Sequence, residues 1–253
     1  MDKRDAPIGI FDSGMGGLSV LRTARALLPH EQFLYYGDTA YAPYGTKTPQ
    51  FVLERARQVT ALLRGEGVKA IVIACNTATG VAAQTLRAEN TLPIIAMEPA
   101  LKPASLMRHG GNVLVLATPV TLSQEKFAHL MERYGEGAIP LPCPGLMDFV
   151  ERLELSGERL NAYFSELFAP YRDRQIDAVV LGCTHYSFLK DAIGAHFPPD
   201  THILDGNEGT VRQLARRLDE LGQLRAGGEG GVQLRTSSTD ASVVDKMKQL
   251  LAM

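Results

Sequence analysis

Two cysteines, each at the end of an apolar run, are the residues of this sequence best suited to chemistry. Ala70–Ala74 precedes Cys75, and Ala178–Gly182 precedes Cys183, 108 residues further along the chain. An apolar run without alternation is typical of a strand buried on both faces of a parallel sheet. Each cysteine is therefore expected at the carboxyl end of such a strand, where open α/β sheets place their ligand sites. Each is followed by two hydrogen-bonding residues, Asn76-Thr77 and Thr184-His185.

Two thiols that face each other can serve as an acid and a base on one carbon atom. An unperturbed thiol has a pKa of about 8.5 and ionises more readily beside a helix N-terminus or a cation. Each cysteine precedes a predicted helix, which would supply that positive end. One thiolate could remove a proton while the other thiol donates one to the opposite face, which inverts a stereocentre. A single thiolate acting as a nucleophile, as in acyl transfer, is the alternative.

Asp12 and His185 are candidate helpers of the two thiols. Asp12 ends the first predicted strand, and His185 lies two residues after Cys183. Neighbouring titratable groups in different environments allow one site to hold an acid and a base together. The alternatives are a helix cap at Asp12 and a structural histidine at position 185. The third thiol, Cys143, lies between two prolines and is expected to be buried and structural.

Hydroxyl and amide side chains at the predicted strand ends suggest a ligand that carries carboxylates. Together with backbone N–H groups at helix starts, such side chains bind carboxylates without a dedicated arginine. The glycines of Asp12–Gly17 fail the spacing of a dinucleotide motif, and no Lys-Ser/Thr follows, so a nucleotide is not expected. The residues concerned are Ser13, Asn76, Thr77, Thr118, Thr121 and Thr184.

Strands and helices alternate along the chain and then restart, which predicts an α/β fold built from two related lobes. Ile8–Ser13 matches Val113–Thr118 at an offset of 105, close to the offset of the two cysteines. We therefore expect two pseudo-symmetric parallel-sheet lobes with the active site in the cleft between them. The first lobe is expected to comprise residues 1–97 together with about 208–253, and the second residues 98–207.

The predicted elements follow from the apolar runs and their periodicity. Strands are expected at residues 8–11, 33–36, 70–74, 93–96, 112–117, 178–182, 202–204 and 232–236. Helices are expected at about 18–28, 50–64, 80–89, 122–134, 147–155, 158–172, 188–196, 208–221 and 242–252.

Composition indicates an ordinary globular protein of 253 residues, with 45% hydrophobic and 21% charged residues. A net charge of −2 with both signs interspersed does not favour nucleic acid or an anionic membrane as a partner. The N-terminus lacks the apolar region of a signal peptide, and no run approaches the roughly 18–20 residues of a membrane span, so a cytosolic protein is expected. The three cysteines form no Cys-x-x-Cys or Cys/His cluster, so neither a disulfide framework nor a metal site is expected.

Four motifs, spread over most of the chain, resemble those of the cofactor-independent glutamate racemases in the aspartate/glutamate racemase superfamily. They occur in the same order as in that family, although Tyr41 stands where an arginine is common. The resemblance implies that Cys75 takes the proton from D-glutamate and Cys183 from L-glutamate, with no cofactor and no metal. The motifs are Gly9–Leu18, Tyr36–Gly45, Ala74–Ala78 and Leu181–Tyr186.

The resemblance also assigns roles to the surrounding residues. Asp12 would assist Cys75, and His185 would assist Cys183. Glu151 would be a further helper, because Cys143–Glu151 is similar to a Cys-Pro…Val-Glu stretch of the family. The implied substrate contacts are Asp12, Ser13, Tyr44, Gly45, Asn76, Thr77, Thr118, Thr121, Thr184 and His185.

The implied activity is interconversion of L- and D-glutamate, a small-molecule substrate, to supply D-glutamate for peptidoglycan, and homodimers are common in the family. A racemase for aspartate or another acidic amino acid is a close alternative, since one methylene changes affinity by only about 1–3 kcal/mol. A hydrolase with a single cysteine nucleophile and a non-catalytic sensor of acidic amino acids are alternatives from other classes.

Overall fold

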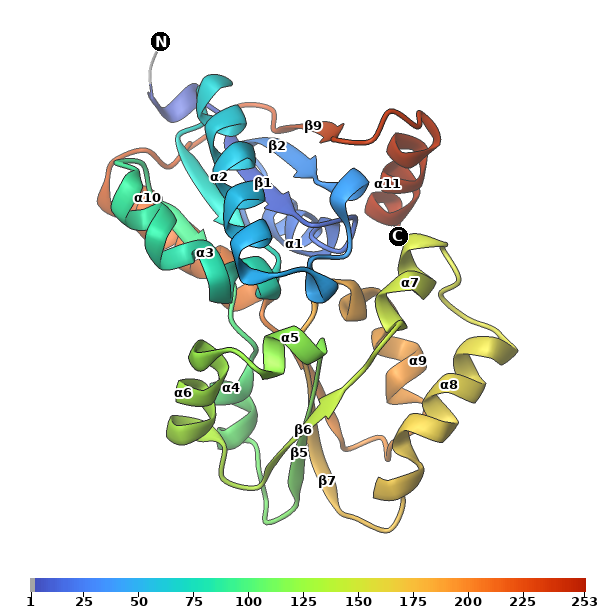
Figure 1. Cartoon of the computed structure of the whole chain (residues 1–253). Coiled ribbons are helices and arrows are strands. Elements are labelled where there is room, and N and C mark those ends of the chain that lie inside the picture. The colour runs from blue at the N-terminus through green and yellow to red at the C-terminus, as the bar shows by residue number, and fades with distance from the viewer. Residues whose placement is uncertain (1–2) are drawn as a thin grey trace.

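The computed structural model describes residues 3–253, which form two parallel β-sheets covered by helices. We call the five-stranded sheet with its helices the first lobe and the four-stranded sheet with its helices the second lobe. Figure 1 shows the first lobe above the second. The first lobe contains β1 (Ile8–Asp12), β2 (Gln32–Gly37), β3 (Ala70–Ile73), β4 (Ile94–Ala96) and β9 (Gly231–Thr236). The second contains β5 (Asn112–Ala117), β6 (Ala138–Pro142), β7 (Ile176–Leu181) and β8 (His202–Asp205).

The two sheets share one strand order over four strands. The first sheet runs β4-β3-β1-β2 and then adds β9, whereas the second, read from its far edge, runs β8-β7-β5-β6. Hence β3 and β7, the strands that precede the two cysteines, occupy corresponding places beside β1 and β5. Every described strand pairing is parallel. These observations confirm the predicted fold class of two related parallel-sheet α/β lobes.

Helices cover both faces of each sheet. In the first lobe, α2 packs against α3, and α1 packs against α10 and α11. Within residues 3–253, no helix is long and apolar enough to cross a membrane. First-lobe helices are α1 (Leu18–Leu27), α2 (Pro49–Gly65), α3 (Asn76–Glu89), α10 (Asn207–Glu220) and α11 (Ser242–Ala252). Second-lobe helices are α4 (Leu101–Leu106), α5 (Pro119–Leu122), α6 (Glu125–Tyr134), α7 (Leu146–Glu151), α8 (Glu158–Phe168) and α9 (Lys190–Gly194).

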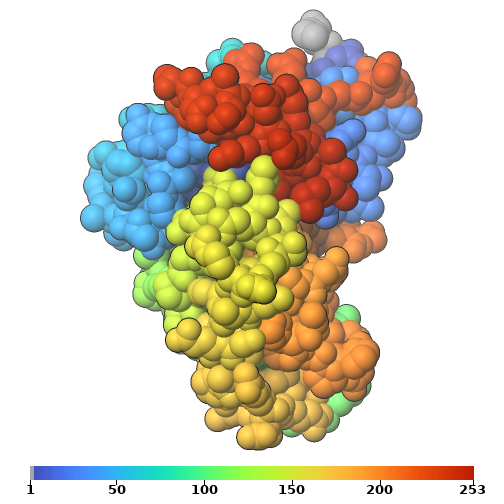
Figure 2. All heavy atoms as spheres, turned by 90° about the vertical axis from the view of Figure 1, so that its right-hand side faces the viewer, coloured from blue at the N-terminus to red at the C-terminus, as the bar shows by residue number. Residues whose placement is uncertain are grey.

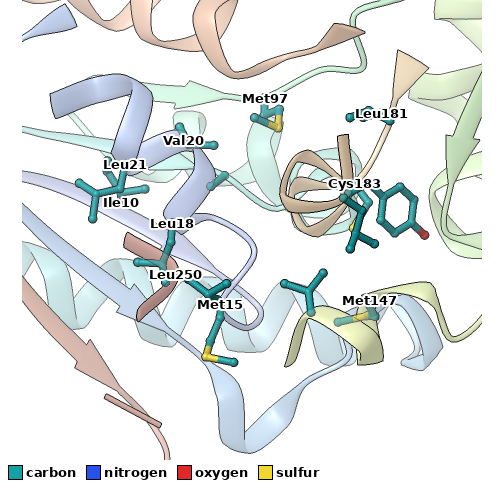
Figure 3. Packing of buried hydrophobic residues seen from close by; sticks show 14 of the residues in the cluster. Ile10, Met15, Leu18, Val20, Leu21, Met97, Met147, Leu181, Cys183 and Leu250 are labelled. Atoms are coloured by element: carbon teal, nitrogen blue, oxygen red, sulfur yellow. The ribbon is translucent and has the colours of Figure 1, made fainter. Parts of the chain in front are cut away.

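Successive strand residues face opposite cores, as the two-residue period of a strand requires. Ile10 belongs to the core that includes α1, whereas its neighbour Phe11 belongs to the core under α2 and α3. The first of these cores continues into the second lobe, where it includes Met147 and Cys183 (Figure 3). The two lobes therefore share one continuous hydrophobic cluster.

The C-terminal part of the chain returns to the first lobe. β9 pairs with β2, and α10 packs on α1. Figure 2 shows the C-terminal residues, in red, against the yellow surface formed by residues around 150. Both views show α11 next to α7 (Figures 1 and 2).

One predicted helix begins earlier than the sequence suggests, and the difference concerns the site. The helix expected from residue 80 begins at Asn76, because Cys75 is its N-cap and accepts a hydrogen bond from Ala78 N at 3.4 Å. Cys75 therefore lies at the positive end of a 14-residue helix.

Several other boundaries were predicted wrongly for local reasons. The helix expected at 122–134 begins only at Glu125, because Gln124 is extended and donates from Nε2 to Thr77 O at 3.1 Å; the short α5 before it was not predicted. The helix expected at 158–172 ends at Phe168, where a 3-10 turn containing Pro170 follows. The helix expected at 147–155 ends at Glu151, shortly before Leu153 takes a φ of 60°.

Three further elements differ from the prediction. The helix expected at 188–196 consists of a 3-10 helix, Thr184–Leu189, followed by the short α9. β6 was not predicted because Pro140 and Pro142 interrupt its apolar run, and it lies at the edge of its sheet, where proline is tolerated. The short helix α4 was also not predicted; it contains Pro103, at the predicted boundary between the lobes.

Candidate active site

A small cavity between the carboxyl ends of the two sheets contains both thiols. Its volume is about 10 Å³, room for about one water molecule. All of its lining residues except Met147 and Gly182 belong to the predicted site. The lining residues are Ser13, Gly45, Cys75, Asn76, Thr77, Thr118, Thr121, Met147, Gly182, Cys183, Thr184 and His185.

Cys75 contacts neutral hydrogen-bonding groups and lies near the buried carboxylate of Asp12. Its Sγ accepts from Ala78 N at 3.4 Å and donates to Ser13 Oγ at 3.7 Å. Burial, followed by the charge of Asp12, raises the pKa of the Cys75 thiol to about 12, although the hydrogen bonds with Ala78 N and Ser13 act to lower it. Cys75 is therefore held as a neutral thiol at physiological pH.

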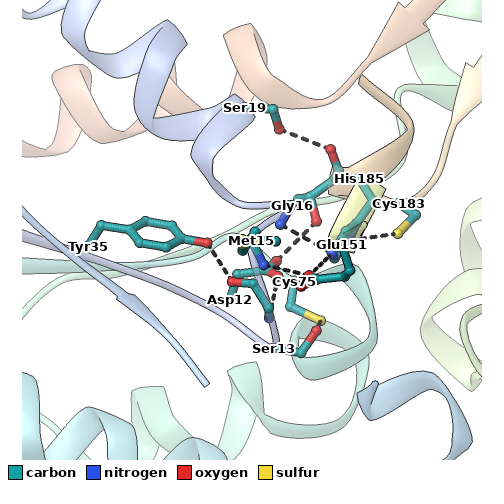
Figure 4. A network of polar contacts seen from close by, with 12 residues as sticks. Asp12, Ser13, Met15, Gly16, Ser19, Tyr35, Cys75, Glu151, Cys183 and His185 are labelled. Carbon is teal, nitrogen blue, oxygen red and sulfur yellow. Dashed lines mark hydrogen bonds and ion pairs between the residues drawn. The ribbon is translucent and has the colours of Figure 1, made fainter. Parts of the chain in front are cut away.

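Cys183 instead faces a charged pair of side chains. His185 Nδ1 lies 3.6 Å from Cys183 Sγ, and His185 Nε2 lies 2.7 Å from Glu151 Oε1 (Figure 4). The 2.7 Å contact requires a proton on one of the two atoms. Because the pKa of Glu151 is lowered, we assign this proton to Nε2, which then cannot also accept from Gly16 N, 3.2 Å away. The histidine thus bridges a thiol and a carboxylate.

The charges of this pair support each other. Burial acts to lower the pKa of His185, but its contacts with Cys183 and Glu151 outweigh burial and raise that pKa well above its ordinary value. Burial acts to raise the pKa of Glu151, but hydrogen bonds from His185 and Met15 N lower it below its ordinary value. The geometry therefore favours an imidazolium between a carboxylate and Cys183.

Asp12 connects the two lobes. It is fully buried, and its carboxylate accepts from Gly14 N at 2.9 Å and from Thr184 Oγ1 at 3.0 Å. Burial raises the pKa of Asp12, against the opposing effect of His185 and the two hydrogen bonds. Its carboxylate does not line the cavity; it influences Cys75 through its charge and holds Thr184, which does line it.

Gly14 and Gly16 are explained by the second lobe, which packs directly against them. A Cβ at Gly14 would collide with Glu151 Oε1, and a Cβ at Gly16 would collide with the His185 ring. Met15 N, between them, donates to Glu151 Oε1 at 2.8 Å. The segment Gly14–Gly16 therefore packs against Glu151 and His185, the two residues predicted to assist Cys183.

Hydroxyl groups from both lobes contact one another in the lining of the cavity. Thr118 caps α5 by accepting from Thr121 N at 3.2 Å, and the hydroxyls of Thr118 and Thr121 lie 2.9 Å apart. Thr77 Oγ1 lies 3.2 Å from Thr121 Oγ1 across the cleft. Asn76 donates to Met97 Sδ, while its buried Oδ1 has no partner among the described residues. A buried acceptor without a partner is suited to a ligand's donor.

Tyr44, like Asp12, is a predicted substrate contact that does not line the cavity. Its hydroxyl donates to Asp38 Oδ2 at 2.5 Å, and Asp38 is also paired with Arg55. The neighbouring Gly45 does line the cavity. Asp38 lies inside the quoted motif Tyr36–Gly45, whereas nothing in the sequence singled out Arg55 or Met147.

A larger cavity of about 610 Å³ lies beyond Asn76 and Thr121, which line both spaces. Neither thiol lines this larger cavity, so the smaller one is the candidate site. Among residues 3–253, no group of three or more His, Cys, Asp or Glu side chains is suited to a metal ion. The smaller cavity is lined by two thiols, one from each lobe.

Comparison with known proteins identifies the family of this chain. The Asp/Glu/Hydantoin racemase family matches residues 18–214. The chain is 48% identical over 254 residues to a glutamate racemase from Clostridium perfringens, covering 99% of this chain and 98% of the relative.

Solved structures give the same result. The chain resembles glutamate racemase from Thermus thermophilus in complex with β-chloro-D-alanine, with a TM-score of 0.85, 36% identity and coverage of 100% and 95% of the two chains. It also resembles the Francisella tularensis enzyme in complex with D-glutamate, with a TM-score of 0.85, 27% identity and coverage of 99% and 95%. These matches confirm the resemblance indicated by the four motifs and the expectation of an enzyme. The chain belongs to the Asp/Glu/Hydantoin racemase family.

Proposed function

We propose that this protein interconverts L- and D-glutamate by proton transfer at Cα between Cys75 and Cys183, with no cofactor. The observation that carries the proposal is that both thiols line one cavity and come from corresponding strands of the two lobes. The relatives named glutamate racemase, one of them bound to D-glutamate, support glutamate as the substrate. Among the described residues, the cavity lining includes no lysine that could form a Schiff base.

Before substrate binds, one thiol is protonated and the other is not, and this decides which enantiomer of glutamate the enzyme can convert first. Cys183, as a thiolate beside the His185 imidazolium, removes the Cα proton of L-glutamate. Cys75, as a neutral thiol, donates its proton to the opposite face and becomes the thiolate. The substrate loses one proton and gains another. When D-glutamate leaves, Cys183 is therefore the neutral thiol and Cys75 the thiolate. The reverse reaction begins from that exchanged state.

Groups around the thiols are suited to an amino acid. We propose that Asn76 Oδ1 accepts a hydrogen bond from the substrate ammonium group, because this oxygen is buried without a protein partner. The hydroxyls of Ser13, Thr77, Thr118, Thr121 and Thr184, and the backbone N–H groups at the start of α3, would bind the carboxylates. Gly45 would contribute through its backbone.

Substrate entry requires the lobes to separate. A cavity of about 10 Å³ cannot hold an amino acid, and contacts such as Glu151 with Met15 N cross between the lobes. We propose that residues 1–97 with about 208–253 move as one unit and residues 98–207 as the other. The segments around residues 97 and 207 would then act as hinges.

The activity is tested by circular dichroism of L- and D-glutamate with reduced protein and no added cofactor. Loss of optical activity from either enantiomer is expected, whereas no change with folded protein would contradict the proposal. L- and D-aspartate in parallel test the alternative substrate. A covalent thioester detected by mass spectrometry would favour a cysteine hydrolase, and binding without turnover would favour a sensor.

The cellular role follows from the product. We propose that the protein supplies D-glutamate for peptidoglycan. Its expression in a bacterial strain that lacks glutamate racemase should remove the requirement for added D-glutamate, and the Cys75→Ala variant should not. Continued dependence on D-glutamate, with active protein present, would contradict this role.

A further inference from the structure

We propose that Arg55, on α2 and outside the cavity lining, is a positioning residue for the active site. It holds Asp38, which in turn holds Tyr44, and this chain of contacts fixes Gly45 in the wall of the cavity. The structural part of the proposal depends only on the contacts described below. Its kinetic consequence rests on the racemase activity proposed above.

Asp38 is the centre of the arrangement. It is fully buried directly after β2, and its backbone N–H donates to Asp12 O at 2.9 Å. Its carboxylate accepts from Arg55 Nε at 2.9 Å, from Arg55 Nη2 at 2.7 Å and from the Tyr44 hydroxyl at 2.5 Å. A buried carboxylate is stable only when paired in this way, so removal of Arg55 leaves an uncompensated charge beneath the site.

The Arg55 guanidinium is fixed on more than one side. Its Cζ lies 3.6 Å from the centroid of the Tyr41 ring, and its Nη1 donates to Gln58. Only 14% of the Arg55 side chain is exposed. A planar fork that both stacks on a ring and pairs with two carboxylate oxygens is a geometry that lysine cannot reproduce.

The contacts lead from Asp38 to the cavity wall. Tyr44 is fully buried and begins the 3-10 helix Tyr44–Thr46. A Cβ on the next residue, Gly45, would approach Thr118 of the second lobe to 3.2 Å, so the backbone packs closely on that lobe. The segment from Asp38 to Thr48 contains only two short 3-10 helices. Thr39 and Ala40 at its start contact Thr236 and Ser237, whereas the buried pair with Arg55 is the contact that reaches Tyr44 through Asp38.

The experiment uses Arg55→Gln, Arg55→Lys and a matched control, Arg57→Gln. Arg57 lies on the same helix and pairs with Glu89 at the surface, at 2.5 Å with both side chains more than 40% exposed. Amide hydrogen exchange of residues 38–46 is measured in each variant, together with kcat and KM for L-glutamate. Thermal unfolding checks that each variant is folded.

We expect faster exchange of residues 38–46 in Arg55→Gln, with KM raised about tenfold and kcat changed much less, because loss of ground-state and transition-state binding together raises KM. Arg55→Lys should give a smaller effect in the same direction and remains the test if Arg55→Gln does not fold. Arg57→Gln should match the wild type in both measurements.

A second readout tests whether Arg55 acts through Tyr44. Tyr44→Phe removes the hydroxyl that reaches Asp38, so its effect on KM and that of Arg55→Gln should not be additive. Unchanged exchange of residues 38–46 in folded Arg55→Gln, or fully additive effects on KM, would overturn the proposal. The exchange measurement requires no turnover, so it remains decisive even if the protein does not racemise glutamate.

Discussion

Cys75 and Cys183 occupy corresponding places in the two lobes, but their surroundings differ. Cys75 caps α3, contacts the hydroxyl of Ser13 and has a pKa raised to about 12 by burial. Cys183 precedes only a 3-10 helix and faces His185, whose other nitrogen contacts Glu151. The repeated fold supplies two thiols, and the residues that follow each strand give them the different surroundings on which the proposed roles of proton donor and base depend.

The difference between the thiols cannot make kcat/KM differ between the two directions of the reaction. L- and D-glutamate have equal free energy in water, so kcat/KM is equal in the two directions for the wild type and for every variant. The asymmetry of the site can therefore show only in kcat and KM taken separately. Each variant below should be measured from both enantiomers for that reason.

Removal of either thiol is expected to have the largest effect. Cys75→Ala and Cys183→Ala should each lower racemisation by at least about 10³-fold, because each removes one of the two proton carriers. The matched control is Cys143→Ala, whose thiol is buried outside the cavity lining and donates to Leu141 O. Substantial racemisation by either active-site variant would break the assignment of one thiol to each face.

Removal of the charged helper is expected to have the next largest effect. His185→Asn should lower kcat/KM by about 10²-fold, because Cys183 loses the imidazolium that stabilises its thiolate. His129→Asn is the control, since His129 is exposed and pairs with Glu125 and Glu132 on its own helix. Equal activity of His185→Asn and the wild type would show that Cys183 needs no such partner.

A chemical label compares the thiols directly. Both lie in the same cavity and are almost equally buried, so their relative rates with iodoacetamide report ionisation more than access. With a pKa of about 12, Cys75 should react slowly near neutral pH, and its rate should rise about tenfold per pH unit into the alkaline range. Cys183 should be labelled first, as peptide mass spectrometry would show. Faster labelling of Cys75 would reverse the comparison.

The repeated thiols could be predicted because buried parallel strands leave apolar runs in the sequence. Residues 70–74 and 178–182 mark β3 and β7 in this way. The contacts that distinguish the thiols could not be predicted by periodicity, since Glu151 meets Met15 N across 136 residues. Glu151 itself entered only through the family resemblance. Tyr41 was noted as a departure from the family motif, but its stacking under Arg55 depends on how α2 packs.

The most direct test of the two-thiol account is the fate of the Cα hydrogen in deuterated water. L-glutamate is incubated with the enzyme, and the two enantiomers are separated and weighed by mass spectrometry within the first few per cent of conversion. The account predicts that the D-glutamate formed carries deuterium at Cα, donated by Cys75, while the remaining L-glutamate keeps its protium. D-glutamate that retains protium at Cα would mean that one base removes and returns the same proton, and would contradict the account.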